Sequence, residues 1–526
     1  MNRWSALALL LAIASALFLR TPHLGNRPLH NDEGVNAIKL AALVERGEYR
    51  YDPHEYHGPT LHYFSQAILW LSGARGNEDL SDARLRVVTV AFGVALILLL
   101  VPLADGLGRS GSAWAGIFLA VSPAFVFYSR YFIHEMLLVF FTLLLLAAGW
   151  RYWQSRKAIW AAIAGGSVGL MFATKETFVL TLAALGFAFF ATQIWNRWRV
   201  RRAGAPNADV VRFRLTTFIS VPHLALAVVT AGFVWLIFFT SFFTNAAGPL
   251  DSFKTYLPWL SRAGGASPHI HPWYFYFERL LWFHPAKSPP WTELIILLLA
   301  IVGGVFGFLG NARVTRPDFI RFLSFFTIAL TGIYTVIGYK TPWCALNFWL
   351  GAILLAGVGA SALIASVRSS FTRVMLLVLI GVCAVHLALQ SWLLTRDFTA
   401  DVRNPYVYAQ TSLHERELTS RVLAIGRVAP DGYATVMKVI SPESYWPLPW
   451  TLRDFKNVGW YEALPEDPYA PIVLVSAKLG ALLDEKSEKR WIMTGLYELR
   501  PQVFFELYVE LELWKQFVAT LPRDSD

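Results

Sequence analysis

Long apolar segments recur throughout this chain, and they restrict its fold more than any other feature of the sequence. About eleven of them are long enough to cross a bilayer as helices. They cover residues 4–20, 86–104, 112–129, 133–150, 158–174, 177–194, 216–243, 291–309, 319–338, 343–365 and 374–395. Hydrophobic residues make up 55% of the chain and charged residues only 16%, a balance that excludes an ordinary soluble protein. The sequence therefore predicts a multi-pass membrane protein.

The basic residues of the loops favour one orientation in the membrane. With the N-terminus in the cytoplasm, the cytoplasmic segments contain sixteen basic residues against Asp105, Asp209 and Asp318, as the positive-inside rule requires. The basic residues are Arg3, Arg109, Arg151, Arg156, Lys157, Arg197, Arg199, Arg201, Arg202, Arg212, Arg214, Arg313, Arg316, Arg321, Arg368 and Arg373. We therefore expect a plasma-membrane protein whose N-terminus is cytoplasmic and whose C-terminal segment is extracytoplasmic. A cleaved signal peptide over the first apolar segment would leave this topology unchanged.

The net charge of +10 follows from the same loops. It is accordingly no sign of nucleic acid binding, and we expect no nucleic-acid partner. Cys344 and Cys383 both lie inside apolar segments, which excludes a disulfide framework and a thiolate metal site.

Two loops on the expected outer side are long and rich in aromatic residues, histidine and proline. They cover residues 21–85 and 244–290. This composition predicts helices that lie along the lipid headgroups.

The chain becomes polar after the last apolar segment. Tyr433–Ile440 and Pro471–Ser476 have the pattern of strands, and Leu479–Lys489 has the pattern of a helix. The predicted fold class is thus an all-α polytopic membrane protein over residues 1–395, followed by a small extracytoplasmic α/β domain over residues 396–526.

Asp32 and Glu33 follow the first apolar segment, near the expected outer surface of the membrane. A carboxylate there can act as a general base on a hydroxyl or hold a divalent cation. The alternative is a solvated acid, or a helix cap at Asn31 or Asp32.

Arg130 and His134 lie four residues apart beside Glu135, at the outer junction of two spans. This spacing places both on one helical face, where the cation can bind a phosphate or anchor the chain at the interface.

Two lysines reach the same outer side. Lys175, followed by Glu176, ends the fifth span, and Lys340 lies in a tight turn between the ninth and tenth spans. Each can act as a point charge for a phosphate. The alternatives are a local ion pair for Lys175 and a snorkelling side chain for Lys340.

These acidic and basic groups come from distant parts of the sequence, yet the topology brings them to one membrane face. An outward cavity of this kind fits the transfer of a group from a lipid phosphate, whose head lies at this level and whose tail lies between helices. A transport pathway would instead place charges near the bilayer midplane and at both faces. His269, His271 and His284 are metal ligands or ordinary loop histidines.

Several of these residues resemble the motifs of the protein O-mannosyltransferase and aminoarabinose transferase group of GT-C membrane glycosyltransferases. The resemblance is closest to a prokaryotic subfamily labelled flippase activity-associated, and it covers roughly residues 1–395. It rests on the acid pair, Arg84, the Thr174–Lys175 step, the stretch His271–Tyr276, and the run Tyr339, Lys340, Thr341, Pro342, Trp343.

The resemblance implies an inverting glycosyltransferase that takes a sugar from a polyprenyl- or dolichyl-phosphate donor. The acceptor is a hydroxyl of a protein, lipid or polysaccharide on the outer face. Asp32 would act as the base and Glu33 would assist it. Donor binding would fall to Arg84, Arg130, Lys175, Lys340 and Tyr276. The cavity or acceptor site would be lined by His57, His134, Glu135, Glu176, His271 and Tyr274.

The chain departs from the aminoarabinose transferases at one position. Those proteins have an acid immediately before the lysine, where this chain has Thr174, with Glu176 following Lys175. The resemblance therefore implies no certain cofactor, and a divalent metal is left open. The subfamily label also leaves open a non-catalytic or transport role associated with flipping of lipid-linked sugars.

Overall fold

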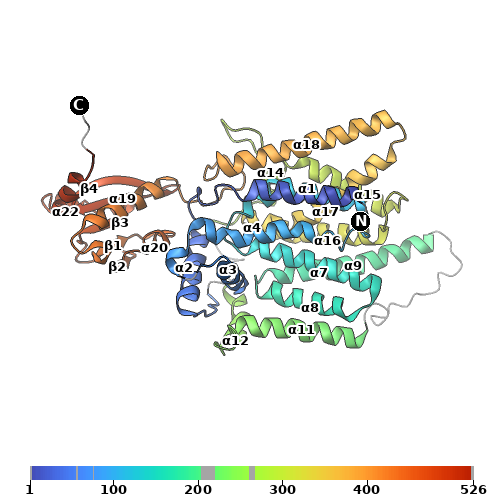
Figure 1. Ribbon diagram of the computed structural model, residues 1–526, viewed down its shortest axis with the longest axis horizontal. Helices are drawn as coiled ribbons and strands as arrows, with labels where there is room; N and C mark the ends of the chain where they lie inside the picture. Colours follow the sequence, from blue (N-terminus) through green and yellow to red (C-terminus); the bar gives the residue numbers. More distant parts are fainter. Residues whose placement is uncertain (1–2, 55–56, 75, 203–219, 260–266, 523–526) are drawn as a thin grey trace. The chain divides into compact units, whose positions relative to one another are not determined.

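The computed structural model describes residues 3–54, 57–74, 76–202, 220–259 and 267–522. The described chain divides into two compact units (Figure 1). The first, here called the helical unit, contains residues 1–24, 43–79 and 83–406. The second, here called the sheet unit, contains residues 25–42, 80–82 and 407–526. The predicted fold class, a mostly helical membrane protein with a small C-terminal sheet domain, is confirmed.

Every predicted apolar segment contains a helix in its described residues, although residues 216–219 lie outside the described part. The helices are α1 (Arg3–Arg20), α4 (Asp82–Leu98), α5 (Arg109–Val121), α6 (Pro123–Tyr128), α7 (Glu135–Ser155), α8 (Ala158–Phe172), α9 (Phe178–Arg202), α11 (Val221–Phe239), α15 (Leu294–Leu309), α16 (Pro317–Val336), η2 (Pro342–Cys344) with α17 (Ala345–Ser366), and α18 (Ser370–Arg396). Among the described residues, seven segments are long and apolar enough to cross a membrane: α1, α7, α9, α11, α16, η2 with α17, and α18. Helices α8 and α15 are shorter apolar helices. The predicted number of eleven spans stays a prediction.

Two predicted spans end early for a local reason. The segment 112–129 is divided at Ser122, which has an extended ψ of 120° before Pro123. In the segment 86–104, α4 ends at Leu98 and the chain continues as turns around Pro102. Proline lacks an amide hydrogen and disfavours a helical conformation at the preceding residue, so the helix cannot continue regularly through either site.

Small residues let the central helices pack closely. A Cβ atom on Gly303 of α15 would lie 2.2 Å from the Leu355 carbonyl oxygen of α17. A Cβ atom on Gly359 of α17 would lie 1.9 Å from the Leu299 carbonyl oxygen of α15. Only glycine permits so close an approach between two helix backbones. Helix α17 is accordingly buried along most of its length.

The two long loops contain helices, and their predicted position along the lipid headgroups stays a prediction. These helices are α2 (Asn31–Arg46), α3 (Thr60–Leu71), η1 (Asn77–Asp79), α12 (Gly248–Lys254) and α14 (Phe275–Leu281).

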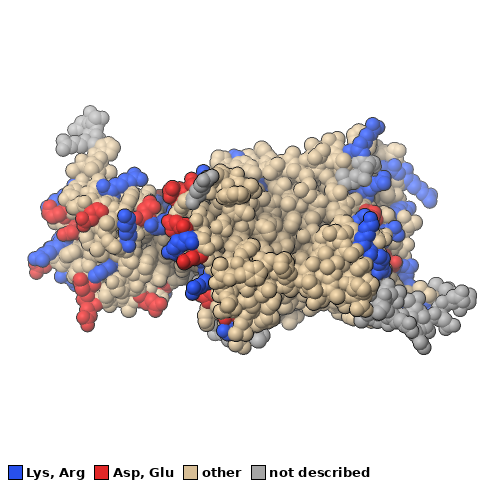
Figure 2. Space-filling view, turned by 60° about the horizontal axis from the view of Figure 1, so that its bottom comes forward, with Lys and Arg blue, Asp and Glu red and all other residues tan. Residues whose placement is uncertain are grey.

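Basic residues gather at one end of the helical unit, where α9 ends with Arg199, Arg201 and Arg202 and α18 begins (Figures 1 and 2). Between this end and the other lies a broad uncharged surface. Helices α11 and α18 contribute exposed apolar side chains to the surface of the unit, such as Val228, Phe233 and Val385. An apolar band of this kind suits contact with lipid tails, and the chain is a multi-pass membrane protein.

The sheet unit is built on a five-stranded mixed sheet in the order β2-β1-β3-β5-β4. The strands are β1 (Met437–Ile440), β2 (Val458–Tyr461), β3 (Ile472–Ser476), β4 (Trp491–Arg500) and β5 (Val503–Glu510). β1 pairs in parallel with β2 and β3, whereas β5 is antiparallel to β3 and β4. Helices α19 (His414–Val428), α20 (Leu448–Thr451) and α22 (Leu511–Ala519), with η3 (Gly432–Ala434), also belong to this unit, and its core contains residues of α19, α20, α22 and the sheet.

β3 coincides with the predicted strand Pro471–Ser476. β1 covers only the second half of the predicted strand Tyr433–Ile440, because η3 occupies its start. The predicted helix over Leu479–Lys489 is formed only in part. Only η4 (Ala477–Leu479) and α21 (Leu483–Lys486) are helical there. Gly480, Leu482, Glu488 and Lys489 have positive φ angles between 48° and 65°. The left-handed conformation interrupts a right-handed helix at each of these positions.

The sheet unit also includes two early segments, unlike the predicted boundary at residue 396. Gln410 donates to the Pro28 carbonyl at 3.0 Å, and Thr411 Oγ1 donates to that of Leu29 at 2.6 Å. Trp450 Nε1 donates to Asp82 Oδ1 at 3.1 Å. The beginning of α2, which contains Asp32 and Glu33, is consequently part of the sheet unit.

Candidate functional site

The centre of the candidate site is a backbone contact between two distant turns of the helical unit. The Gly58 amide donates to the Thr174 carbonyl at 3.0 Å, and the Thr60 amide donates to the Ala173 carbonyl at 3.1 Å. A Cβ atom on Gly58 would lie 2.1 Å from the Ala173 carbonyl oxygen, so this position requires glycine. The contact fixes the loop before α3 against the turn between α8 and α9.

Two ion pairs lie on this frame. Lys175 Nζ pairs with Glu135 Oε1 at the start of α7, and both side chains are buried. His57 Nδ1 lies 3.1 Å from Oε2 of Glu176, which is also buried. We call His57, His134, Glu135, Lys175 and Glu176 the ion-pair cluster. The structure brings together these five residues, all of which the sequence singled out.

His134 connects the cluster to the backbone frame. Its Nε2 donates to the Gly58 carbonyl at 3.0 Å, and its ring centroid is 5.0 Å from that of His57. Burial, followed by the charges of His57, His62 and Lys175, holds the pKa of His134 well below its usual value. The ring is therefore neutral, and its buried Nδ1 is an acceptor with no hydrogen-bond partner in the described chain.

The ion pairs keep Lys175 and Glu176 charged. Burial alone would lower the pKa of Lys175, but the Glu135 carboxylate outweighs it and raises the pKa above its usual value. Burial alone would raise the pKa of Glu176, but the charge and hydrogen bond of His57, with the charge of Lys175, outweigh it and lower the pKa. Each buried charge thus depends on its partner.

Breaking the Glu135–Lys175 pair should destabilise the protein strongly. In Glu135→Gln the buried Lys175 charge loses its partner, and we expect a loss of about 3 kcal/mol, seen as a lower Tm in detergent. The double variant Glu135→Gln/Lys175→Met removes both charges and should recover most of this loss. A double variant as unstable as the single one would show that the pairing does not set the stability.

Lys340 differs from Lys175 because its charge is not neutralised. Its Nζ donates to the carbonyl oxygens of His271, at 3.2 Å, and Ile337, and the residue is 1% exposed. Among the residues that the structure describes, no acidic side chain pairs with it. Burial lowers the pKa of Lys340. An ammonium group has three hydrogens, so one remains for an anionic ligand.

A short backbone bridge holds the Lys340 turn in place. The Lys340 amide donates to the His269 carbonyl at 2.8 Å, and the His271 amide donates to the Gly338 carbonyl at 3.1 Å. Ile270 and Tyr339 form an antiparallel bridge between these bonds. The loop before α14 is thereby fixed to the turn before η2.

Tyr276, predicted for the donor site, and His271 and Tyr274, predicted for the cavity or acceptor site, belong to the segment that this bridge holds. His271 stacks on Phe275 with ring centroids 4.1 Å apart, and burial, with the charges of Arg279, His269 and Lys340, lowers the pKa of His271. Tyr276 is buried and packs against Phe348 with ring centroids 5.4 Å apart, whereas Tyr274 is 47% exposed.

The two arginines predicted to bind the donor engage the protein itself. Arg130 donates to the carbonyl oxygens of Arg20 at 2.8 Å, Pro22 at 2.7 Å and His23 at 3.2 Å, which satisfies the end of α1. Arg84 pairs with Asp79 at 3.1 Å and is half exposed. Donor binding by either residue stays a prediction.

The acid pair lies in the sheet unit. Glu33 is buried, pairs with Arg27 at 2.9 Å and accepts the His30 amide at 2.8 Å. The Asp32 side chain is 42% exposed, and its amide donates to His30 Nδ1 at 3.2 Å. Asp32 is therefore the more accessible acid, whereas Glu33 stabilises the local fold. The expected convergence of Asp32 with Lys175 and Lys340 stays a prediction.

Glu293 is a buried acid of the helical unit that the sequence did not single out. Glu293 accepts hydrogen bonds from Ser122 Oγ (2.6 Å), Ala124 N (2.8 Å), Trp349 Nε1 (2.9 Å) and Tyr406 OH (2.6 Å). These donors come from α6 and the residue before it, from α17, and from the segment after α18, so one carboxylate connects distant elements. Its only signal in the sequence is an acid at the start of an apolar segment.

No metal site is evident in the part of the chain that the structure describes. No three or more His, Cys, Asp or Glu side chains there are grouped so that they could hold a metal ion.

A membrane bundle with charged turns and a small terminal sheet domain is characteristic of the GT-C fold, and this chain has that fold. Residues 57–206, which include the ion-pair cluster, match the family model described as dolichyl-phosphate-mannose-protein mannosyltransferase. No protein of the curated collection matches.

Solved structures share the fold at low sequence identity. ArnT from Cupriavidus metallidurans, solved bound to undecaprenyl phosphate, is 14% identical with a TM-score of 0.60, and the alignment covers 97% of this chain and 98% of ArnT. The oligosaccharyltransferase AglB from Archaeoglobus fulgidus, solved with an inhibitory peptide and a dolichol-phosphate, is 14% identical with a TM-score of 0.56. That alignment covers 91% of this chain and 70% of AglB. At this identity the similarity establishes the fold.

Proposed function

We propose that this chain is an integral membrane glycosyltransferase that moves a sugar from a polyprenyl- or dolichyl-phosphate donor to an acceptor hydroxyl on the outer face. The observation that carries the proposal is Lys340, a buried lysine whose two contacts are both carbonyl oxygens. A buried cation without a counter-charge is costly, and a bound phosphate supplies that charge. The matched family and the lipid phosphates bound by ArnT and AglB support the same donor class.

The reaction is an inverting displacement at the anomeric carbon. Asp32 takes the proton of the acceptor hydroxyl as its oxygen forms the new bond to the anomeric carbon. The bond from that carbon to the phosphate oxygen breaks, and negative charge grows on the leaving lipid phosphate. Lys340 stabilises this charge, and Lys175 adds a positive charge that is shared with Glu135.

The proposed orientation follows from the distribution of charge. The arginine-rich end of the helical unit would face the cytoplasm, and the N-terminus with it. The turns that contain Lys175 and Lys340 follow α8 and α16 and would face outward. The C-terminal segment would be extracytoplasmic.

Donor binding should weaken at alkaline pH. Burial lowers the pKa of Lys340, so the side chain loses its proton at a lower pH than an ordinary lysine and then no longer attracts phosphate. In Lys340→Arg the guanidinium stays charged, and affinity should persist to higher pH. Titration of undecaprenyl phosphate onto the protein in nanodiscs measures this; identical alkaline profiles for the two proteins would contradict the assignment to Lys340.

The function can be tested in cells that lack the protein. Mass spectrometry of their lipid extracts should show accumulation of a polyprenyl-phosphate monosaccharide, together with loss of one sugar from surface glycans. A flipping role would instead leave the lipid-linked sugar confined to the cytoplasmic leaflet, where a membrane-impermeant oxidant cannot reach it. Unchanged lipid and glycan profiles would contradict both roles.

A further inference from the structure

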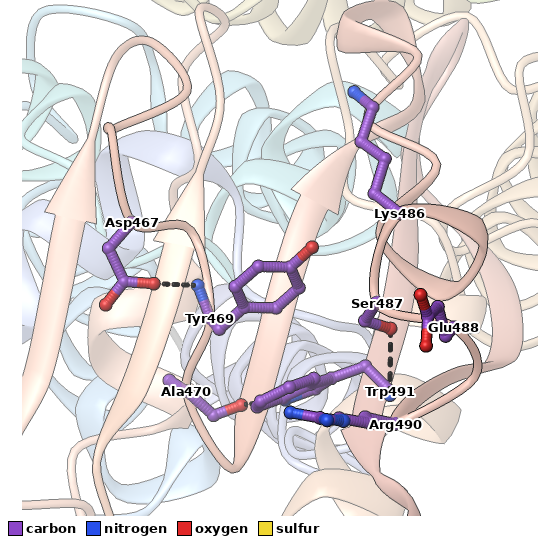
Figure 3. Close-up of a pocket in the computed structure, with 8 residues that line it drawn as sticks. All are labelled: Asp467, Tyr469, Ala470, Lys486, Ser487, Glu488, Arg490 and Trp491. Atoms are coloured by element: carbon purple, nitrogen blue, oxygen red, sulfur yellow. Dashed lines mark hydrogen bonds between the residues drawn. The ribbon is translucent and has the colours of Figure 1, made fainter.

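The sheet unit contains an open hollow of about 650 Å³ at the end of the sheet where β3 and β4 begin (Figure 3). Its size is within the range of small-molecule sites, roughly 300–1,000 Å³. The residues that line it are Asp467, Tyr469, Ala470, Lys486, Ser487, Glu488, Arg490 and Trp491. None of them belongs to the ion-pair cluster or to the Lys340 turn.

Two aromatic rings form a fixed surface in this hollow. The rings of Tyr469 and Trp491 have centroids 4.5 Å apart and planes tilted by 36°. Trp491 Nε1 donates to the Ala470 carbonyl at 2.7 Å. The Tyr469 amide donates to Asp467 Oδ1 at 3.1 Å, and the Trp491 amide donates to Ser487 Oγ at 3.1 Å. These bonds fix the Trp491 ring and the backbone of Tyr469, whose ring packs against that of Trp491.

Charged side chains of both signs surround the rings. Figure 3 shows Asp467 on one side of Tyr469 and Lys486 and Glu488 on the other. The side chains of Lys486, Glu488 and Arg490 form no ion pair or hydrogen bond within the described chain, whereas Asp467 lies 3.5 Å from Lys438. The lining therefore offers donors and acceptors that are not already used.

We propose that this hollow binds a neutral saccharide. A pyranose ring has an apolar face of C–H groups, which packs on an aromatic ring, and an edge of hydroxyls, which both donate and accept hydrogen bonds. Two basic and two acidic residues line the hollow, so their formal charges cancel and a neutral ligand is favoured over an anionic one. In the cell this saccharide would be part of the glycan of the acceptor, an assignment that rests on the proposed function.

The test is saturation-transfer NMR on the full chain in nanodiscs with a panel of neutral trisaccharides (mannotriose, cellotriose and chitotriose). We expect saturation transfer from the protein to the pyranose C–H protons of at least one trisaccharide. Tyr469→Ala should weaken its binding about tenfold, because the packing surface is lost. Tyr469→Phe should retain binding, since it keeps the ring. Lys515→Ala, which removes an exposed lysine of α22, is the matched control and should bind as the wild type does.

Two outcomes would overturn the saccharide site. One is the absence of saturation transfer from the protein to any of the trisaccharides. The other is a trisaccharide that binds Tyr469→Ala as tightly as it binds the wild type. Donor hydrolysis and transfer are measured on the same samples. Transfer without saccharide binding refutes only this site, whereas saccharide binding without any transfer refutes only the proposed function.

Discussion

Asp32→Asn is expected to lower the rate of sugar transfer by about 100- to 10,000-fold, which is the usual contribution of a general base. The carboxamide has nearly the size of the carboxylate but cannot accept the proton of the acceptor hydroxyl. Asp32 is 42% exposed and pairs weakly with His30 at 3.9 Å, so its replacement should leave the fold intact. Lipid phosphate binding should also be retained.

The neighbouring acids provide controls for this variant. Glu33→Gln breaks the buried pair with Arg27 and should lower Tm as well as activity, because it disturbs the fold. Glu45→Gln changes an exposed acid of the same helix and should change neither. Transfer by Asp32→Asn at the wild-type rate, with wild-type Tm, would remove Asp32 from the role of base.

Lys340→Met is expected to reduce kcat/KM by about 100- to 1,000-fold, as is usual when one group that stabilises developing negative charge is lost. The same variant should keep or raise Tm, because it removes a buried charge that has no acidic partner in the described chain. This combination of lower activity and undiminished stability separates a ligand-binding lysine from a structural one.

Lys340→Arg and Lys254→Met are the matched variants. The arginine keeps the charge and should retain part of the activity, while its different geometry limits the recovery. Lys254 is an exposed lysine paired with Asp251, and its replacement should have little effect. Full activity in Lys340→Met would contradict the proposed phosphate contact.

The helical part of the fold could be predicted from hydropathy because each span satisfies its backbone hydrogen bonds internally. The errors have local causes. Pro123 divides a segment that hydropathy alone treats as continuous, and positive φ angles at Leu482 and Glu488 interrupt a pattern that otherwise favours a helix. β2, β4 and β5 were missed because they belong to a mixed sheet whose pairing depends on tertiary contacts.

The candidate site could be predicted only as a set of charged residues. Topology placed Lys175, Lys340 and Arg130 on one side, but the partner of each depends on the folded structure. Lys175 pairs with Glu135, and Arg130 donates to carbonyl oxygens near the end of α1. Glu293 gave no signal, because its four donors are separated from it by 56 to 171 positions along the chain.

The most direct test of the proposed transferase uses purified protein in nanodiscs. Its substrate is the polyprenyl-phosphate sugar isolated from cells that lack the protein. The measurement is the release of free polyprenyl phosphate together with the appearance of the sugar on an acceptor hydroxyl. We expect release and transfer in equal amounts, inverted configuration at the anomeric carbon, and no reaction above background with Asp32→Asn. A donor that binds the wild-type protein yet remains intact after prolonged incubation with extracted acceptors would contradict the proposed reaction.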